Sequence, residues 1–160
     1  WQQVEKLSVF LESDSVLLYW SMEDEVITHD FADRWYGKKD ILLPSIENDR
    51  IVVRRYEGRQ SLIPGPRYGI PEPVGPVIAD LSGTGMIVVP GRAFDVYGNR
   101  LGRGKGFYDV LLGSAVSGCS SRPVAVGVCF GCQYLPLVPT EGTDVKVDMV
   151  ISSTVSQTVG

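Results

Sequence analysis

Met86-Ile-Val-Val-Pro90 is a short, continuous apolar run, which is typical of a strand buried on both faces of a parallel sheet. A loop over residues 91–106 follows it, and a helical pattern then runs from about Lys105 to Gly113, where the glycine predicts the end of the helix. A strand, a loop and a helix in this order form the repeating unit of α/β proteins. The sequence therefore predicts an α/β layer fold built around this unit.

Similar apolar runs recur along the chain and extend the predicted sheet. They cover residues 15–20, 41–44, 51–55, 124–130 and 147–151. Helical patterns lie over residues 1–11 and 30–36, and Thr28 is placed to cap the second of these helices.

Ligands of open α/β sheets bind in the loops that follow the carboxyl ends of the strands. Three predicted loops hold this position, over residues 21–25, 91–106 and 130–133. The proline-rich segment 64–73 contains an aromatic residue and a glutamate, so we interpret it as an ordered loop that lines a site.

The bulk composition restricts the classes of function. With 160 residues the chain has the length of one domain, and its net charge of -4 argues against broad nucleic-acid binding and against a basic membrane surface. No apolar run approaches the roughly 20 residues of a membrane span. The odd count of three cysteines, with no apparent signal peptide, favours reduced thiols and a cytoplasmic location. Because the first residue is Trp1 rather than Met, we expect the natural chain to begin earlier.

Cys129-Phe-Gly-Cys132 matches the C-x-x-C pattern of redox and zinc sites. A zinc site would need further ligands, and His29 is the only histidine of the chain. The alternative is a pair of small residues near the end of a buried strand. We expect His29 to lie at the surface or at the start of a helix rather than to act as a catalytic base.

Gly98-Asn-Arg-Leu-Gly-Arg-Gly-Lys-Gly-Phe-Tyr-Asp109 carries the strongest chemical signal of the sequence. Its glycines at positions 102, 104 and 106 let the backbone approach a ligand, and N–H groups at the start of a helix bind anions. Arg100, Arg103 and Lys105 suit phosphate oxygens, and Asp109 suits Mg²⁺ beside them. The segment matches neither a Walker A loop nor the dinucleotide G-x-G-x-x-G pattern. It predicts a phosphate site, with a solvated basic turn as the alternative.

This segment, together with Pro90-Gly91-Arg-Ala-Phe-Asp95 before it, closely resembles the signature of the 5-formyltetrahydrofolate cyclo-ligases, also called methenyltetrahydrofolate synthetases. Three further motifs resemble segments of the same family in the same order. They are Ser21-Met-Glu-Asp-Glu25-Val-Ile-Thr28, Tyr68-Gly-Ile-Pro-Glu-Pro73, and residues 133–136 with Asp144-Val-Lys-Val-Asp148. The resemblance implies one cyclo-ligase domain over residues 1–160. It also implies a three-layer, Rossmann-like fold with a mostly parallel central sheet and helices on both faces, like that of isomerases and CoA transferases.

The resemblance implies an activity as well: conversion of 5-formyltetrahydrofolate and ATP to 5,10-methenyltetrahydrofolate, ADP and phosphate, with Mg²⁺. The residues implied to bind ATP are Arg100, Leu101, Gly102, Arg103, Gly104, Lys105, Gly106, Phe107 and Tyr108. Those implied to bind the folate are Trp20, Glu25, Tyr68, Arg103, Gly104, Lys105, Gly106 and Phe107. Arg103 and Lys105 are implied to stabilise the transition state, and Asp109 and Asp148 to bind Mg²⁺.

Alternatives remain open at several of these positions. The alternative for Asp148 is a structural carboxylate that caps a turn, and the alternative for Tyr68 is an ordinary loop aromatic. We expect Glu23 and Asp24, beside Glu25, to be solvated.

The chain also departs from the family in two places. The family's N-terminal helix, with its Lys and Arg for the ATP phosphates, is not found ahead of Trp1, and Gly142-Thr-Asp144 lacks the His of many relatives. Two other functions compete with the cyclo-ligase. One is an α/β enzyme that grips a sugar phosphate or a CoA ester with the same loop, and the other is a catalytically weak folate or nucleotide binder. We expect a monomer that binds neither nucleic acid nor membranes.

Overall fold

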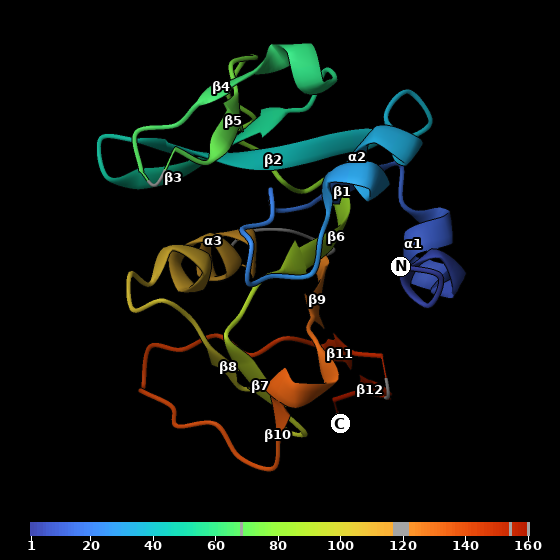
Figure 1. Cartoon of the computed structure of the whole chain (residues 1–160), viewed down its shortest axis with the longest axis vertical. Helices are drawn as coiled ribbons and strands as arrows, with labels where there is room; N and C mark the ends of the chain where they lie inside the picture. The colour runs from blue at the N-terminus through green and yellow to red at the C-terminus, as the bar shows by residue number, and fades with distance from the viewer. Residues whose placement is uncertain (68, 117–121, 154, 160) are drawn as a thin grey trace.

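The computed structural model describes residues 1–67, 69–116, 122–153 and 155–159, and its core is a seven-stranded sheet (Figure 1). The strand order is β12-β11-β9-β6-β1-β2-β3. These strands are β12 (Ser156–Thr158), β11 (Met149–Ile151), β9 (Val124–Val128), β6 (Thr84–Val89), β1 (Ser15–Leu17), β2 (Asp40–Glu47) and β3 (Arg50–Arg55). The five inner strands run parallel, and each edge strand is antiparallel to its neighbour. The predicted α/β fold with a mostly parallel sheet is therefore confirmed.

The inner strands are buried because their apolar side chains alternate between two core clusters. Along β6, successive side chains belong in turn to one cluster and to the other. The first cluster also contains side chains of α1 (Ser8–Glu12) and α2 (His29–Trp35), and the second contains side chains of α3 (Phe107–Val116). Burial on both sides explains why these strands are continuous apolar runs in the sequence.

The helices differ from the predicted ones in their limits. The helix predicted to stop at Gly113 continues to Val116, because apolar side chains on either side of the glycine pack against the sheet and hold the extra turn. The helix predicted over residues 1–11 is instead two short ones, η1 (Val4–Lys6) and α1, because Leu7 between them is extended. The helix predicted over residues 30–36 is present as α2. No helix in the described parts of the chain is long and apolar enough to cross a membrane.

The strand prediction for residues 51–55 was wrong about the kind of strand. Residues 51–55 do form a strand, but it is an antiparallel edge strand rather than a buried parallel one. Asn48 and Asp49 join it to β2 in a two-residue turn, with positive φ angles of 48° and 60°. Asn and Asp tolerate this conformation, so the chain returns directly without a crossover helix.

Parts of the segments that were predicted as loops form the short strands of two small sheets. They consist of β4 (Leu62–Pro64) with β5 (Pro71–Pro73), and of β10 (Tyr134–Leu135) with β7 (Ala93–Asp95) and β8 (Arg100–Leu101). Short 3-10 helices, η2 (Arg59–Ser61) and η3 (Gly131–Gln133), precede β4 and β10. Figure 1 shows β4 and β5 beside β2 at one end of the molecule, and β7, β8 and β10 at the other.

The sheet changes its direction of growth between β1 and β6. From β1 the chain adds β2 and β3 on one side, and it then crosses to β6 and adds β9 and β11 on the other. The loops that leave the carboxyl ends of β1 and β6 therefore diverge at this point, which is where open α/β sheets bind ligands. These are the predicted loops over residues 21–25 and 91–106.

Candidate active site

A cleft of about 970 Å³ contains most of the predicted site residues. The predicted residues that line it are Trp20, Glu25, Arg100, Leu101, Gly102, Arg103, Gly104, Lys105, Gly106, Phe107, Tyr108 and Asp109. Tyr68, predicted to stack on the folate ring, lies outside the described residues. Residues 130–133 do not line the cleft, so the third predicted loop does not belong to its wall.

The hairpin of β7 and β8 fixes the start of the cationic loop, and buried Asp95 holds that hairpin together. Its Oδ1 accepts the backbone N–H groups of Tyr97 and Asn99 at 2.9 and 3.0 Å. Its Oδ2 accepts the side-chain amide of Asn99 and the N–H of Val138, each at 2.9 Å. Burial opposes the ionised form, but these hydrogen bonds outweigh it, and the pKa of Asp95 lies below its ordinary value.

Replacing Asp95 by asparagine is expected to lower the free energy of unfolding at pH 7 by about 2 to 3 kcal/mol, because an amide cannot accept all four hydrogen bonds. A lowered pKa in the folded state means that the carboxylate stabilises the fold above its unfolded pKa, and that this contribution is lost as the pH falls through the folded pKa. The difference between wild type and Asp95→Asn should therefore narrow below about pH 3.8. Urea unfolding of both proteins from pH 3 to 7 measures this difference in the free energy of unfolding. A difference that stays constant over this range would contradict the stabilising role of the Asp95 carboxylate.

Arg100 is buried at the base of the loop and holds Asp109. Its side chain is only 7% exposed, and its Nη2 lies 2.8 Å from Oδ2 of Asp109. The second oxygen of Asp109 accepts the N–H of Val145 at 3.2 Å. Gly102 leaves room for the folded-back arginine, since a Cβ there would lie 2.6 Å from Nη1 of Arg100. Arg100 thus orients the predicted magnesium carboxylate and ties α3 to β8.

The other two cations of the loop differ in their partners. Arg103 forms an ion pair with Asp24 and lies 3.7 Å from Oε1 of Glu25, so it links the cationic loop to the loop after β1. Asp24 also lies 3.5 Å from Arg92, and it is therefore an ion-pair partner rather than a purely solvated residue. Lys105 is exposed and has no hydrogen bond or ion pair with any residue that the structure describes. The glycines on either side of it have φ angles of 77° and 65°, a region that favours glycine.

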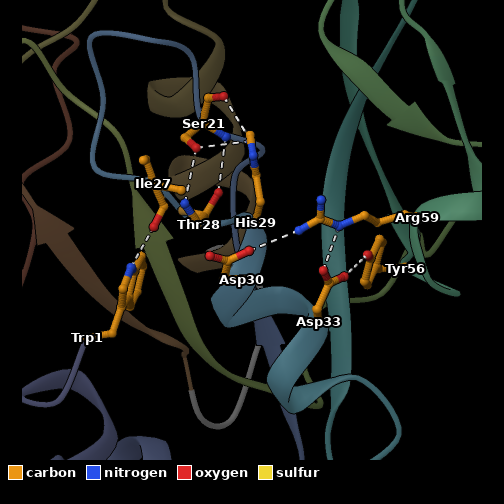
Figure 2. Close-up of polar contacts among 9 residues, drawn as sticks. All are labelled: Trp1, Ser21, Ile27, Thr28, His29, Asp30, Asp33, Tyr56 and Arg59. Atoms are coloured by element: carbon orange, nitrogen blue, oxygen red, sulfur yellow. Dashed lines mark hydrogen bonds and ion pairs between the residues drawn. The ribbon is translucent and has the colours of Figure 1, made fainter.

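Figure 2 shows how the loop over residues 21–28 is closed at its base. The N–H of Ser21 donates to Oγ1 of Thr28, and the N–H of Thr28 donates to Oγ of Ser21, each at 3.1 Å. Nε2 of His29 lies 3.1 Å from both oxygens of Ser21. The Thr28 hydroxyl donates to the carbonyl of Tyr19 at 2.6 Å, so it closes this loop instead of capping α2. His29 begins α2, which confirms its predicted place at a helix start.

Trp20, the predicted wall of the folate site, is supported from behind by other rings. Its indole stacks on His29, with centroids 4.1 Å apart and an interplanar angle of 17°, and it is tilted against Tyr56 at 5.8 Å. The hydroxyl of Tyr56 donates to Asp33, which also accepts a hydrogen bond from Arg59 at 2.6 Å (Figure 2). The protein itself therefore sets the position of Trp20 in the cleft wall.

Glu25 and Tyr108 face the same part of the cleft. The side chain of Glu25 is 13% exposed, and its Oε2 accepts the N–H of Met22 at 2.9 Å. The hydroxyl of Tyr108 is buried and has no hydrogen-bond partner among the described residues. Burial first, and then the charge of Glu25, raise the pKa of Tyr108 above its ordinary value. Tyr108 is therefore a neutral hydrogen-bond donor at any physiological pH.

Two further parts of the cleft wall contain residues that were not individually assigned a role from the sequence. They are formed by Pro44, Ile46, Ile51, Arg67, Ile70 and Glu72, and by Pro139, Thr140, Glu141, Thr143 and Asp144. The segment 64–73 does line the cleft, as its composition predicted, through Arg67, Ile70 and Glu72. Asp144 is the first residue of the motif over residues 144–148, and the hydrogen bond from the N–H of Val145 to Asp109 brings this segment beside the predicted magnesium carboxylate. The signal available in the sequence was an acidic residue at the first position of a segment that resembles the family.

The structure does not bring Asp148 to the cleft. Both of its oxygens accept hydrogen bonds from Arg122, and its Oδ2 also accepts the N–H of Ala125 at 2.8 Å. Asp148 precedes β11 at the amino end of that strand, whereas the cleft lies at the carboxyl ends of its neighbours. The placement matches the alternative of a satisfied structural carboxylate. Within the described ranges, no cluster of three or more His, Cys, Asp or Glu side chains is arranged to hold a metal.

The two cysteines of the C-x-x-C pattern differ in environment. Cys129 follows β9 and is buried, Cys132 is exposed, and both are free thiols. Burial, and next the neighbouring Cys132, raise the pKa of the Cys129 thiol to about 11. A thiol with so high a pKa is a weak nucleophile at neutral pH. Cys129 therefore fits the interpretation of a small core residue at a strand end.

Known proteins share this fold and these motifs. The model of the 5-formyltetrahydrofolate cyclo-ligase family matches residues 1–153. The 5-formyltetrahydrofolate cyclo-ligase of Mus musculus is 32% identical over 159 residues, which cover 94% of this chain and 78% of the mouse protein. That of Escherichia coli is 28% identical over 144 residues, covering 86% and 77%. The NMR structure of Aquifex aeolicus 5,10-methenyltetrahydrofolate synthetase superposes with a TM-score of 0.84 at 30% identity, covering 99% of this chain and 78% of that one. The chain therefore belongs to the 5-formyltetrahydrofolate cyclo-ligase family.

Proposed function

We propose that this protein converts 5-formyltetrahydrofolate to 5,10-methenyltetrahydrofolate and cleaves ATP to ADP and phosphate, with Mg²⁺. The chain belongs to this family, and one structural observation supports the proposed activity. The cationic glycine-rich loop and the loop that contains Glu25 line a single cleft, and Arg103 connects them. A phosphate-binding loop and a carboxylate for N–H groups are what a nucleotide and a reduced pterin require.

In the proposed reaction the formyl oxygen of the substrate attacks the γ-phosphorus of ATP and displaces ADP. N10 then attacks the formyl carbon, the carbon–oxygen bond breaks, phosphate leaves with that oxygen, and N10 loses its proton. Lys105 and Arg103 stabilise the charge on the transferred phosphoryl group, while Trp20 and Glu25 hold the pterin. Such a reaction depends mainly on positioning and on charge stabilisation.

The cleft contains two carboxylates suited to Mg²⁺, Asp109 and Asp144. Mg²⁺ prefers one or two carboxylates together with phosphate oxygens, and when bound it neutralises phosphate charge. Asp109 is oriented by Arg100, and one oxygen of Asp144 accepts the N–H of Glu141 at 2.7 Å. We therefore assign the metal to Asp109 and Asp144, because Asp148 lies outside the cleft and its oxygens accept hydrogen bonds from Arg122 and Ala125.

Paired substitutions separate these two assignments. Asp144→Asn is expected to raise the Mg²⁺ concentration for half-maximal rate about 10- to 100-fold, because it removes a negative ligand. Asp148→Asn should leave that concentration unchanged and lower the free energy of unfolding by about 1 kcal/mol, because it weakens the contact with Arg122. Initial rates titrated with Mg²⁺, together with urea unfolding, measure both effects. If only Asp148→Asn moved the Mg²⁺ titration, the metal would belong to Asp148.

The activity itself is tested by mixing the protein with 5-formyltetrahydrofolate, ATP and Mg²⁺ and following the near-ultraviolet absorbance of the methenyl product. We expect an absorbance rise that requires ATP and releases one phosphate per product. If the protein binds folate and nucleotide but forms no product, it is a catalytically inactive binder. Turnover with a sugar phosphate or a CoA ester instead would identify a different α/β enzyme.

We also propose the finer description of the fold, a three-layer, Rossmann-like arrangement with helices on both faces, like that of isomerases and CoA transferases. Its support is that α1 and α2 contribute to one core cluster and α3 to the other. The cytoplasmic location and the monomeric state remain predictions from the sequence.

A further inference from the structure

Glu72 is a buried carboxylate in the cleft wall that the reaction described above does not use. It lies in β5, is 7% exposed, and lines the cleft. Its Oε2 accepts the hydroxyl of Ser45 at 2.8 Å and the N–H of Ile46 at 3.0 Å, so neutral donors of β2 fix it in place. Its Oε1 has no hydrogen-bond partner among the described residues.

The charge of Glu72 is not balanced by any cation in the described part of the chain. The nearest arginine in sequence, Arg67, forms its ion pair with Asp49 instead. Glu25 differs in this respect, because its Oε1 faces Arg103. A buried carboxylate without a cation is costly unless donors satisfy it, and a carboxylate that lines a cleft can take such donors from a ligand.

The surroundings of Glu72 suit the flat, apolar body of a heterocycle. Ile46 and Ile51 are cross-strand partners in β2 and β3, Ile70 lies two residues ahead of Glu72, and all three line the cleft. The cations Arg103 and Lys105 lie on the loop after β8, which is a different segment of the cleft wall from β5. A ligand triphosphate belongs with those cations, because an unbalanced carboxylate repels it.

An ionised carboxylate only accepts hydrogen bonds, and this decides between the two ring systems of the substrates. The pyrimidine edge of a reduced pterin presents two adjacent donors, the 2-amino group and N3–H. The corresponding edge of adenine presents one donor, the 6-amino group, beside an acceptor, N1. Glu72 therefore matches the pterin and mismatches the adenine.

We propose that Glu72 is a specificity-determining residue that accepts hydrogen bonds from the 2-amino and N3–H edge of the pterin. The inference rests on the proposed function and adds to it the orientation of the folate, with the pterin edge toward β5. In this orientation Glu25 accepts hydrogen bonds from the remaining N–H groups of the pterin ring.

The test compares Glu72→Gln with wild type. Glutamine can keep the hydrogen bonds from Ser45 and Ile46 through its oxygen, but it then turns an NH₂ group toward the donors of the pterin. We expect the KM for 5-formyltetrahydrofolate to rise about 10- to 100-fold and the KM for ATP to change less than about threefold. Glu72→Asp keeps the negative charge on a shorter side chain. It replaces Glu72→Gln in the same comparison of KM values if Glu72→Gln does not fold.

Ser45→Ala is the matched control, because it removes one support of Glu72 without touching the ligand. It should change the KM for the folate by less than about threefold. A rise in the KM for ATP in Glu72→Gln, or equal KM values in Glu72→Gln and wild type, would overturn the proposal.

Binding of 6-methyltetrahydropterin, measured by calorimetry without ATP, keeps this inference separate from the proposed activity. Wild type should bind this probe, and Glu72→Gln should bind it about 10- to 100-fold more weakly. If wild type forms no methenyl product but shows this difference, the proposed reaction fails and the role of Glu72 stands. If turnover is normal and both proteins bind the probe equally, only the role of Glu72 fails.

Discussion

Lys105→Ala is expected to lower kcat about 10²- to 10³-fold while changing folate affinity much less. Arg100 is committed to Asp109, and Arg103 is paired with Asp24. Lys105 alone among the cations of this loop has no partner in the described part of the chain. A compact ammonium on a flexible stem can follow the phosphoryl group as it moves, so its contribution is greatest in the transition state. Single-turnover rates, with calorimetric affinities for the folate, separate the two effects.

Lys146→Ala is the matched control for this prediction. Lys146 is also exposed and carries the same charge, but it does not line the cleft. Its removal should leave kcat within about twofold of wild type. If Lys105→Ala weakened folate binding as much as it slowed turnover, Lys105 would only bind substrate and would not act in the chemical step.

Phe94→Ala is expected to lower the free energy of unfolding by about 3 to 5 kcal/mol, the largest loss of stability that we predict for a single side chain. Phe94 lies in β7 and is 0% exposed. Its ring packs directly on two glycines: a Cβ at Gly91 would lie 2.7 Å from it, and a Cβ at Gly127 would lie 2.4 Å from it. The ring thus joins β7, at the start of the cationic loop, to β9 of the central sheet. Removing it leaves a cavity that the surrounding strands cannot fill.

Urea unfolding at pH 7 measures the loss, and Phe130→Ala provides the comparison. Phe130 is 44% exposed, so its removal should cost less than about 1 kcal/mol. Equal losses in the two variants would show that Phe94 is not the link between the loop and the sheet.

The central part of the fold could be predicted because its signals are local. The apolar run that ends at Pro90, the glycine-rich loop and the start of α3 follow one another in the sequence, and each has its own physical signature. Asn48 and Asp49 carried an equally local hairpin signal that the prediction overlooked. Gly113 failed as a stop signal because side chains far away in sequence bury the turn that follows it.

The remainder of the site depends on contacts that no local pattern reveals. Asp144 and Asp148 are only four residues apart, but Asp144 lines the cleft with Asp109, whereas Asp148 lies at the amino end of β11. Arg122, which takes up the charge of Asp148, lies in a separate segment of the chain. The glutamate of segment 64–73 indicated a loop that lines a site, but it did not reveal the contacts of Glu72, because its environment is assembled from β2 and β5.

The ion pair between Asp24 and Arg103 has a consequence for ligand affinity. Asp24 competes for Arg103, so an anion that displaces Asp24 gains only the difference between the two contacts. Asp24 belongs to the same loop as Glu25, so an anion that displaces it also changes the electrostatic field at Glu25. We therefore expect the affinity for each proposed substrate to depend on whether the other is bound.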